Sequence, residues 1–388
     1  MSDIAIQDLL ALLTIPGPPA SESRVAEHLR RVLLDLGIPA DCIVRDNAHQ
    51  QSEYGGDGGN LIVRLDGHAR GPRRLFSAHM DTVPGCVGAS ARLDGNRIVN
   101  DAPGKALGGD NRTGCACVLQ VARTLVARKR NHAPATLIFF VQEEVGLVGA
   151  RGLDLTKLGE PKPSLGFNFD GYHADVFITA VTGTERFTID IEGIAAHSGM
   201  NPEDGVSAAL IAADALAELG RDGWHGLVEK PAGTGKANVG IIKGGTGSNV
   251  VMPALHILAE ARCHDPAFRK TIIAAWHDAF QRAAKSRRNH RGESGHVRFG
   301  PGPTYEAYAL ADDAAVVRTA LAAAQRLGIK PRLIRDDGGN DANWIVAHGI
   351  PALTIGCGQR HVHMPNEEID LHDFTRACRL AVELAVTG

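Results

Sequence analysis

TLIFFVQEE (residues 136–144) is an apolar run that ends in two adjacent carboxylates, Glu143 and Glu144. The run has the length and composition of a buried strand, so both acids would stand where they repel each other and lose hydration. A charged carboxylate is stable in such a place only when a cation or a proton compensates it. The stretch therefore predicts a sheet strand with a cation- or proton-binding site at its end.

Other polar residues follow apolar, strand-like segments in the same way. They are His79 and Asp81 after residues 75–78, Asp110 after two glycines, Asp170 after residues 165–169, and His363 near the C-terminus. Taken singly, each has a plainer explanation: a core histidine, a helix N-cap at Asp110, a turn acid or a surface histidine. Taken together, they have the composition of a metal-assisted hydrolase, in which one acid holds a metal and its neighbour handles a proton.

The bulk composition limits the class of protein. A chain of 388 residues with 44% hydrophobic and 22% charged residues indicates a globular protein of two domains. The net charge of -3 gives no reason to expect nucleic acid or an anionic membrane as a partner. The longest apolar stretches are about half of what a bilayer crossing needs. Seven cysteines without a CxxC pair, and an N-terminus without signal-peptide features, lead us to expect a cytoplasmic protein with reduced thiols.

The order of strand and helix patterns predicts one domain interrupted by another. Short apolar strands alternate with helices over most of the chain, which predicts an α/β fold with a largely parallel sheet. Ser21 is a candidate N-cap for a helix with Val25, Leu29 and Leu33 on its apolar face. Near residue 184 the pattern changes to half-buried strands with long helices, and after about residue 301 the α/β pattern returns.

Four motifs then occur in order: SAHMDTVP (77–84), GDNRTG (109–114), QEEVG (142–146) and HMPNE (363–367). Together they resemble the M20 family of co-catalytic zinc peptidases, and most closely its peptidase T-like branch of tripeptide aminopeptidases. The resemblance implies a zinc-exopeptidase-like α/β catalytic domain, residues 1–183 and 300–388. It also implies an inserted α+β lid and dimerisation domain, residues 184–299.

The resemblance also assigns roles to residues. His79, Asp110 and Asp170 would hold one metal ion. Asp110, Glu144 and His363 would hold a second, so that Asp110 bridges the two. Glu143 would be the general base that takes a proton from a metal-activated water, and Asp81 would orient His79. Nitrogen and oxygen ligands suit two zinc ions, with cobalt or manganese as alternatives.

Further site residues are implied in the inserted segment. GIAAHSG (193–199) resembles the family's lid motif and makes His197 a catalytic candidate, and GGTGSN (244–249) makes Asn249 a substrate-binding candidate. In many dimeric relatives such groups come from the partner subunit. Arg262 matches a family arginine that binds a substrate carboxylate, although an ordinary ion pair would explain it too. GGND (338–341) resembles a family GGTD-type turn near the metals.

The sequence departs from the family pattern beside Asp110. Asn111 stands where peptidase T relatives commonly carry Asp, and Arg112 stands where Lys is frequent. The family often has a non-proline cis peptide after the bridging Asp, so we expect one at Asp110-Asn111.

The function that the resemblance implies is that of a dinuclear zinc exopeptidase that hydrolyses short peptides, of the tripeptidase type of aminopeptidase. One alternative is an amidohydrolase, deacylase or dipeptidase that acts on N-acyl amino acids or dipeptides. A remote alternative is an inactive metal-binding scaffold. The expected partners are a short peptide or an N-acyl amino acid as substrate, and a second copy of the chain bound through the lid domain.

Overall fold

The structure is a computed structural model that describes residues 2–387. The chain divides into two compact units. The first comprises residues 2–180, 309–336 and 340–387, and the second comprises Val181–Tyr308 with Asp337–Gly339. The first unit is thus interrupted by the second, and the second continues past residue 299, the end that the family resemblance implies for the inserted domain.

A nine-stranded sheet is the frame of the first unit, in the order β1-β2-β6-β3-β7-β16-β8-β14 with β15 beside β8. Its strands are β1 (Ile43–Arg45), β2 (Leu61–Leu65), β3 (Arg74–His79), β6 (Ala135–Phe140), β7 (Leu165–Phe169), β8 (Val176–Val181), β14 (Tyr308–Ala309), β15 (Arg332–Asp336) and β16 (Ala352–Ile355). The central strands β6, β3, β7 and β16 are parallel, whereas β2 and β8 flank them antiparallel. The expected parallel sheet is therefore confirmed for the centre and not for the flanks.

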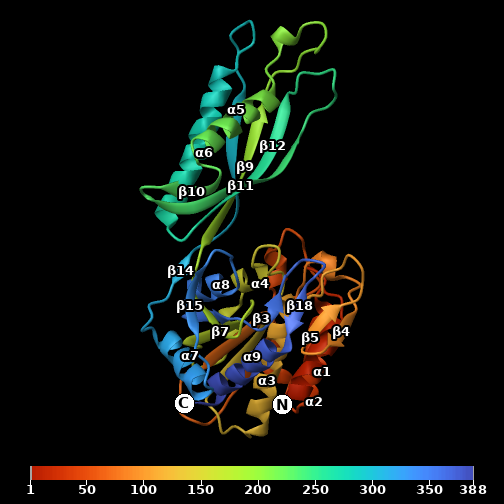
Figure 1. Ribbon diagram of the computed structural model, residues 1–388, viewed down its shortest axis with the longest axis vertical. Helices are drawn as coiled ribbons and strands as arrows, with labels where there is room; N and C mark the ends of the chain where they lie inside the picture. The colour runs from red at the N-terminus through yellow and green to blue at the C-terminus, as the bar shows by residue number, and fades with distance from the viewer. Residues whose placement is uncertain (1, 388) are drawn as a thin grey trace. The chain divides into compact units, whose positions relative to one another are not determined.

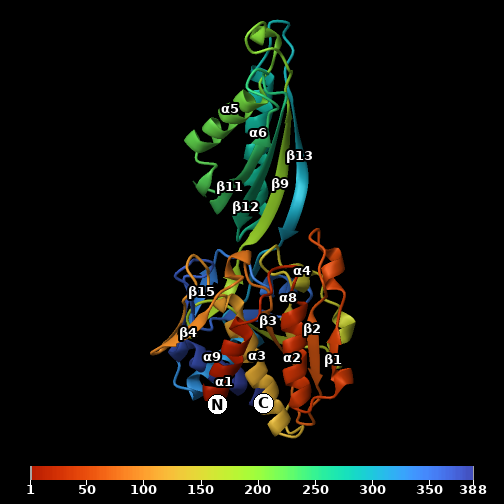
Figure 2. The same cartoon turned by 90° about the vertical axis from the view of Figure 1, so that its right-hand side faces the viewer.

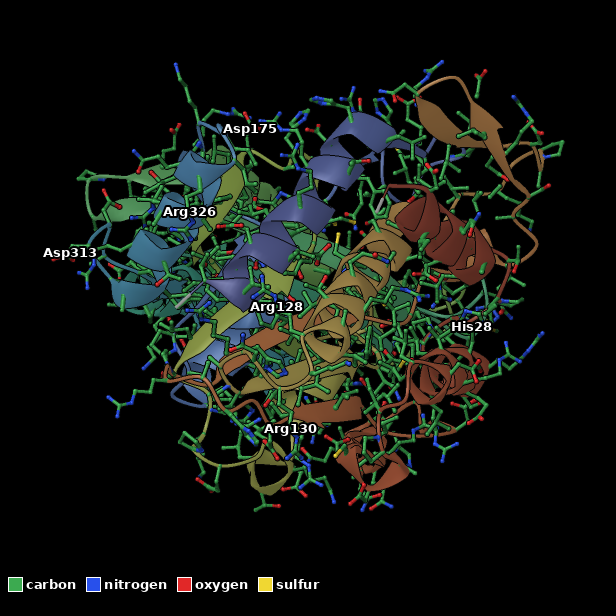
Figure 3. All side chains as sticks on the ribbon, turned by 90° about the horizontal axis from the view of Figure 1, so that it is seen from below. His28, Arg128, Arg130, Asp175, Asp313 and Arg326 are labelled. Atoms are coloured by element: carbon green, nitrogen blue, oxygen red, sulfur yellow. The ribbon has the colours of Figure 1, made fainter. Side chains whose placement is uncertain are left out.

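Helices pack on this sheet through apolar faces. They are α1 (Ser2–Leu13), α2 (Ser23–Asp35), α3 (Gly109–Ala127), α4 (Val148–Arg151), α7 (Ala315–Arg326), α8 (Ala342–Ala347) and α9 (Leu371–Val386). α3 and α9 lie side by side (Figure 1), and their buried side chains belong to one core with those of β3, β6 and β7. Figure 3 shows the end of the unit at which α3 ends, with Arg128 as its C-cap, and at which α7 ends with Arg326. Asp110 therefore lies at the opposite end of α3.

A second, small sheet connects distant parts of the first unit. It consists of β17 (Gln359–Arg360), β18 (Glu368–Asp370), β5 (Arg97–Asn100) and β4 (Ala91–Asp94), in that order. The antiparallel pairing of β18 with β5 holds the segment around His363 near the segment that leads to Asp110.

The second unit is a five-stranded antiparallel sheet with two helices on one face (Figure 2). Its strands are β10 (Gly226–Lys230), β11 (Gly233–Gly244), β12 (Ala254–Cys263), β9 (Gly183–Glu192) and β13 (His296–Tyr305), and its helices are α5 (Ala208–Arg221) and α6 (Pro266–Ser286). Phe187, Ile189 and Ile191 alternate with more exposed residues along β9, because only one face is covered. β13 pairs with β9 as far as Tyr305, which explains why the unit extends beyond residue 299.

One local prediction was wrong in detail. α2 begins at Ser23 with Glu22 in the N-cap position, and no side chain caps it, so Ser21 does not have the predicted role. Val25, Leu29 and Leu33 are nonetheless buried as expected.

All seven cysteines are free. None of the helices within residues 2–387 combines the length and apolar character required to cross a membrane.

Candidate active site

Three adjacent parallel strands bring most of the candidate residues to one edge of the sheet. β3 lies between β6 and β7, and the carboxyl ends of parallel strands meet at the same edge. His79 is the last residue of β3, Glu143 and Glu144 come shortly after β6, and Asp170 directly follows β7. Apolar strands with polar residues at their ends therefore place these groups together.

Asp110 enters this edge from the start of α3. The Asp110-Asn111 peptide bond is cis, as expected. Asp110 does not cap the helix; Asn111 does, since its Oδ1 accepts the amide of Gly114 at 3.0 Å. The Asn111 Nδ2 also donates to the carbonyl of Phe169 at 2.8 Å, a bond that an ionised aspartate could not make. This explains an asparagine at a position where aspartate is frequent.

The two oxygens of Asp110 face two different histidines. Oδ1 lies 3.1 Å from Nε2 of His79, and Oδ2 lies 3.2 Å from Nε2 of His363. The same nitrogen of His363 is 2.9 Å from Oε1 of Glu144, and that of His79 is 3.8 Å from Oδ2 of Asp170. The structure thus brings together all five residues for which the sequence predicted a metal-binding role, in two triplets that share Asp110.

The pKa values in this cluster are strongly shifted. Hydrogen bonds with Asp110 and Glu144 raise the pKa of His363 to about 10. Burial would lower the pKa of His79, but hydrogen bonds with Asp110 and Asp81 raise it well above its usual range. Burial, followed by the charge of Asp110, raises the pKa of Asp170 to about 7. Without a cation, protons on these groups compensate the crowded carboxylates.

Glu143 lies in the same cluster and is half-buried. Burial raises its pKa well above the usual range; His79 opposes this shift, and the charges of Asp341 and Glu144 add to it. The Asp341 carboxylate is fully buried, and both of its oxygens lack a hydrogen-bond partner among residues 2–387. The sequence placed Asp341 in a turn near the metals but gave it no role.

Asp81 contacts more than His79. Nδ1 of His79 lies 3.1 Å from the backbone oxygen of Asp81 and 3.4 Å from its Oδ1. The Asp81 carboxylate accepts the amide groups of Glu143 and Glu144, both at 3.0 Å. Since Nδ1 has an acceptor in Asp81, Nε2 of His79 is the nitrogen free to bind a metal. Asp81 therefore positions both the histidine and the pair of glutamates.

The donor set fits divalent cations. Ligand atoms of His79, Asp110 and Glu144 lie within 4.8 Å of one another, and so do those of His79, Glu143 and Asp170. All are imidazole nitrogens or carboxylate oxygens, the donors that suit zinc, manganese and cobalt. Burial raises the pKa of the unpartnered Asp341 carboxyl well above its usual range, and a nearby cation would favour its ionised form. The group of His79, Glu143 and Asp170 contains Glu143, so its geometry allows that residue to act as a ligand as well as a base.

The pKa shifts predict that metal affinity rises with pH. A metal and a proton compete for the same atoms of His363 and Asp170, whose pKa values are about 10 and about 7. Between pH 6 and 8 each site must release the proton of its histidine, His79 or His363, on binding, so we expect the affinity of each site to increase by about tenfold per pH unit. The site that contains Asp170 should show a steeper dependence below pH 7. Competition with a chromogenic chelator at pH 6, 7 and 8 would measure this slope. An affinity independent of pH would contradict the ligand set.

Two residues that the sequence analysis did not select hold the ligand loops in place. Glu367 accepts the amide groups of Leu107 and Gly108, both at 2.8 Å, and that of Asp110 at 3.1 Å. Gln359 accepts the amide of Gly171 at 2.9 Å and donates to Oδ1 of Asn111 at 2.9 Å, so it joins the loop of Asp170 to that of Asp110. Both are buried. These contacts span more than 180 residues of sequence, which is why no local pattern revealed them.

Glu367→Ala is expected to weaken metal binding by about 10- to 100-fold, the usual cost of losing a group that holds a metal ligand. The substitution removes the acceptor of three amides, including that of Asp110. Glu368→Ala is the matched control, since Glu368 forms an ion pair with Arg97 instead. Equal metal affinities of the two variants in chelator competition would show that Glu367 does not position Asp110.

The remaining candidates belong to the second unit. Nδ1 of the exposed His197 accepts the amides of Gly199 and Met200 at 3.2 Å, which leaves Nε2 as the protonated nitrogen. Asn249 lies beside it, and its carbonyl accepts the amide of Ser198 at 3.0 Å. Arg262 binds Glu260 through Nε at 2.8 Å and Nη2 at 3.2 Å. The ordinary ion pair considered for Arg262 is therefore present.

Comparisons with known proteins agree with this geometry. Residues 75–387 match the model of peptidase family M20/M25/M40. The chain is 29% identical over 381 residues to protein YqjE of Bacillus subtilis, covering 98% of this chain and 96% of YqjE. It is similar to the structure of aminopeptidase PepT from Bacillus cereus, with 29% identity and a TM-score of 0.83, covering 99% of this chain and 98% of that one. It is also similar to a tripeptidase from Staphylococcus aureus, with 25% identity, a TM-score of 0.86 and the same coverage. The chain therefore belongs to peptidase family M20/M25/M40 and is a metal-dependent hydrolase of that family.

Proposed function

We propose that the chain is a two-metal exopeptidase that hydrolyses short peptides with a free amino terminus, as a tripeptidase-type aminopeptidase. The observation that carries the proposal is the placement of Asp110, whose two oxygens face His79 and His363 at 3.1 and 3.2 Å. Similarity to a tripeptidase over nearly the whole chain supports the choice of substrate.

In this proposal His79, Asp110 and Asp170 hold one divalent ion, and Asp110, Glu144 and His363 hold the other. Two such ions, when bound, polarise the scissile carbonyl and lower the pKa of the attacking water. Zinc is the ion we propose, with cobalt and manganese as alternatives.

Glu143 is proposed as the residue that moves protons. Its carboxylate takes a proton from the attacking water and later gives it to the nitrogen of the leaving amine. Burial raises the pKa of Glu143, which favours the uptake of a proton by its carboxylate. Asp81 fixes the backbone of Glu143 through an amide hydrogen bond of 3.0 Å.

The test of the substrate class is hydrolysis of a small panel followed by mass spectrometry. The panel contains free-amino di-, tri- and tetrapeptides, N-blocked versions of each, and N-acetyl amino acids. Release of the N-terminal residue from free peptides alone is the expected result. Cleavage of the N-acyl substrates alone would replace the proposal by an amidohydrolase or deacylase.

We also propose that the second unit acts as a lid and dimerisation domain, with His197 as a hydrogen-bond donor to the reaction's oxyanion and Asn249 and Arg262 as substrate-binding groups. The exposed, protonated Nε2 of His197 supports the donor role. To bind a substrate, Arg262 would have to release its contact with Glu260.

Free thiols at all seven cysteines support a cytoplasmic location.

His197→Ala is expected to lower turnover by about 10²- to 10³-fold, the usual cost of removing an oxyanion donor. If His197 acts across a homodimer, mixing this variant with Glu143→Ala should restore activity. Random exchange makes half of the dimers mixed, each with one complete site, so about a quarter of wild-type activity should return. No recovery, with subunit exchange demonstrated by size-exclusion chromatography of tagged chains, would place the site within one chain.

A further inference from the structure

Three consecutive backbone amides at the end of β6 are held by two buried carboxylates. Asp81 accepts the amides of Glu143 and Glu144. Oε1 of Glu22 accepts the amide of Gln142 at 3.0 Å, together with that of Ala20 at 3.0 Å. The segment that carries both glutamates is therefore fixed from two directions, one of them a residue 120 positions earlier in the chain.

Gln142 needs such support because of its backbone conformation. Its φ is +54°, in the left-handed region of backbone conformations. Residues other than glycine rarely adopt this conformation, and they keep it only when the surrounding structure enforces it. The side chain is held as well: Oε1 accepts from Oγ of Ser52 at 2.5 Å, and Nε2 donates to the carbonyl of Gly55 at 2.8 Å. The conformation of Gln142 sets the direction in which the chain, and with it Glu143, leaves the strand.

Glu22 is suited to accept an amide without acting as a counter-ion. The residue is fully buried, and its Oε2 has no hydrogen-bond partner among the described residues. Burial, followed by the charge of Asp81, raises the pKa of Glu22 to about 8. A neutral carboxylic acid at physiological pH leaves Oε1 as a good acceptor and adds no charge to an already acidic site.

We propose that Glu22 is a positioning residue of this enzyme, which sets the orientation of Glu143 through the amide of Gln142. Glu22 lies outside residues 75–387, the part of the chain that matches the family model. The proposal rests on the proposed role of Glu143 as the base. It predicts that loss of the acceptor impairs turnover more than substrate binding or metal binding.

The experiment compares four variants of the full, metal-loaded chain. Glu22→Ala removes the acceptor, Glu22→Leu removes it while filling the space, and Glu22→Gln keeps an acceptor oxygen. Asp8→Ala is the matched control, since Asp8 is also buried and hydrogen-bonded but contacts Gln120 and Arg123 toward the other end of α3. The measurements are kcat, KM, metal affinity by chelator competition, and hydrogen–deuterium exchange of the peptide containing residues 142–144.

For Glu22→Ala and Glu22→Leu we expect kcat to fall by about 10- to 100-fold, as for a misplaced catalytic group, with KM within about twofold and metal affinity unchanged. Exchange at residues 142–144 should increase in both variants. Glu22→Gln should remain within about threefold of wild type in kcat and keep wild-type exchange.

Two results would overturn the proposal. A kcat for Glu22→Leu no lower than that for Asp8→Ala, with unchanged exchange at 142–144, would show that Glu22 does not position the base. A Glu22→Gln variant as impaired as Glu22→Leu would show that charge, and not the acceptor, matters. If the wild-type chain hydrolyses none of the panel, the proposed function fails, and the exchange result alone then decides whether Glu22 fixes this segment.

Discussion

Glu143→Ala is expected to lower turnover by between about 10²- and 10⁴-fold, the range for loss of a general acid–base group, while the metal content stays at the wild-type value. The half-buried carboxylate lies in the cluster of proposed ligands, and burial raises its pKa, as suits a group that takes up a proton. Alanine removes the proton carrier but leaves His79, Asp110 and Asp170 in place. Steady-state kinetics and elemental analysis of the same preparation measure both quantities.

The neighbouring acid provides the control. Glu144 has nearly the same position in the chain, and its Oε1 lies 2.9 Å from Nε2 of His363. Glu144→Ala should therefore lose one metal as well as activity. Loss of metal from Glu143→Ala would show that Glu143 is a ligand, which the short distances within its triplet with His79 and Asp170 allow. Substantial turnover by Glu143→Ala would exclude it as the base.

Asp110→Asn is expected to have the largest effect on metal binding. Asp110 is the only one of the five proposed ligands whose oxygens face both histidines. Loss of its charge would weaken both sites together, by more than the 10- to 100-fold that a change in a supporting group costs. Hydrogen bonds with His363 and His79 hold the pKa of Asp110 well below its usual range despite burial, which shows how strongly its negative charge is stabilised.

The measurement is the number of metal ions that each purified variant binds. Wild-type protein should bind two ions, Glu144→Ala one, and Asp110→Asn none at concentrations that saturate the wild type. Asp154→Asn is a suitable control, because Asp154 caps a short helical turn at Thr156 and contacts none of the ligands. Retention of one tightly bound ion by Asp110→Asn would contradict the bridging role.

The sequence predicted the fold class and indicated which residues the ends of the central strands bring together, but it missed details of the fold around them. Strands that end in polar residues are a local pattern, and β3, β6 and β7 bring His79, Glu144 and Asp170 together as that pattern requires. The order of four motifs added Asp110 and His363, which come from a helix start and a loop. β13 was not predicted, because its sequence GPGPTY interrupts the alternation expected of a strand.

The supporting residues could not be found in the same way. Glu22 looks like an ordinary residue at the start of an amphipathic helix, and only the folded chain shows that it reaches the amide of Gln142. Gln359 and Glu367 likewise act on residues more than 180 positions away. Hydrogen bonds between residues so distant in the sequence produce neither a periodic pattern nor a characteristic composition. They can therefore be identified only in the folded structure.

The central claim is that this chain hydrolyses peptides with metal ions held by the cluster around Asp110. The most direct test is to remove metal from the purified protein with a chelator and to measure release of the N-terminal residue from a tripeptide as zinc is added back. The account predicts no turnover in the stripped protein and full recovery at two equivalents of metal. Turnover that persists in fully stripped protein would contradict it.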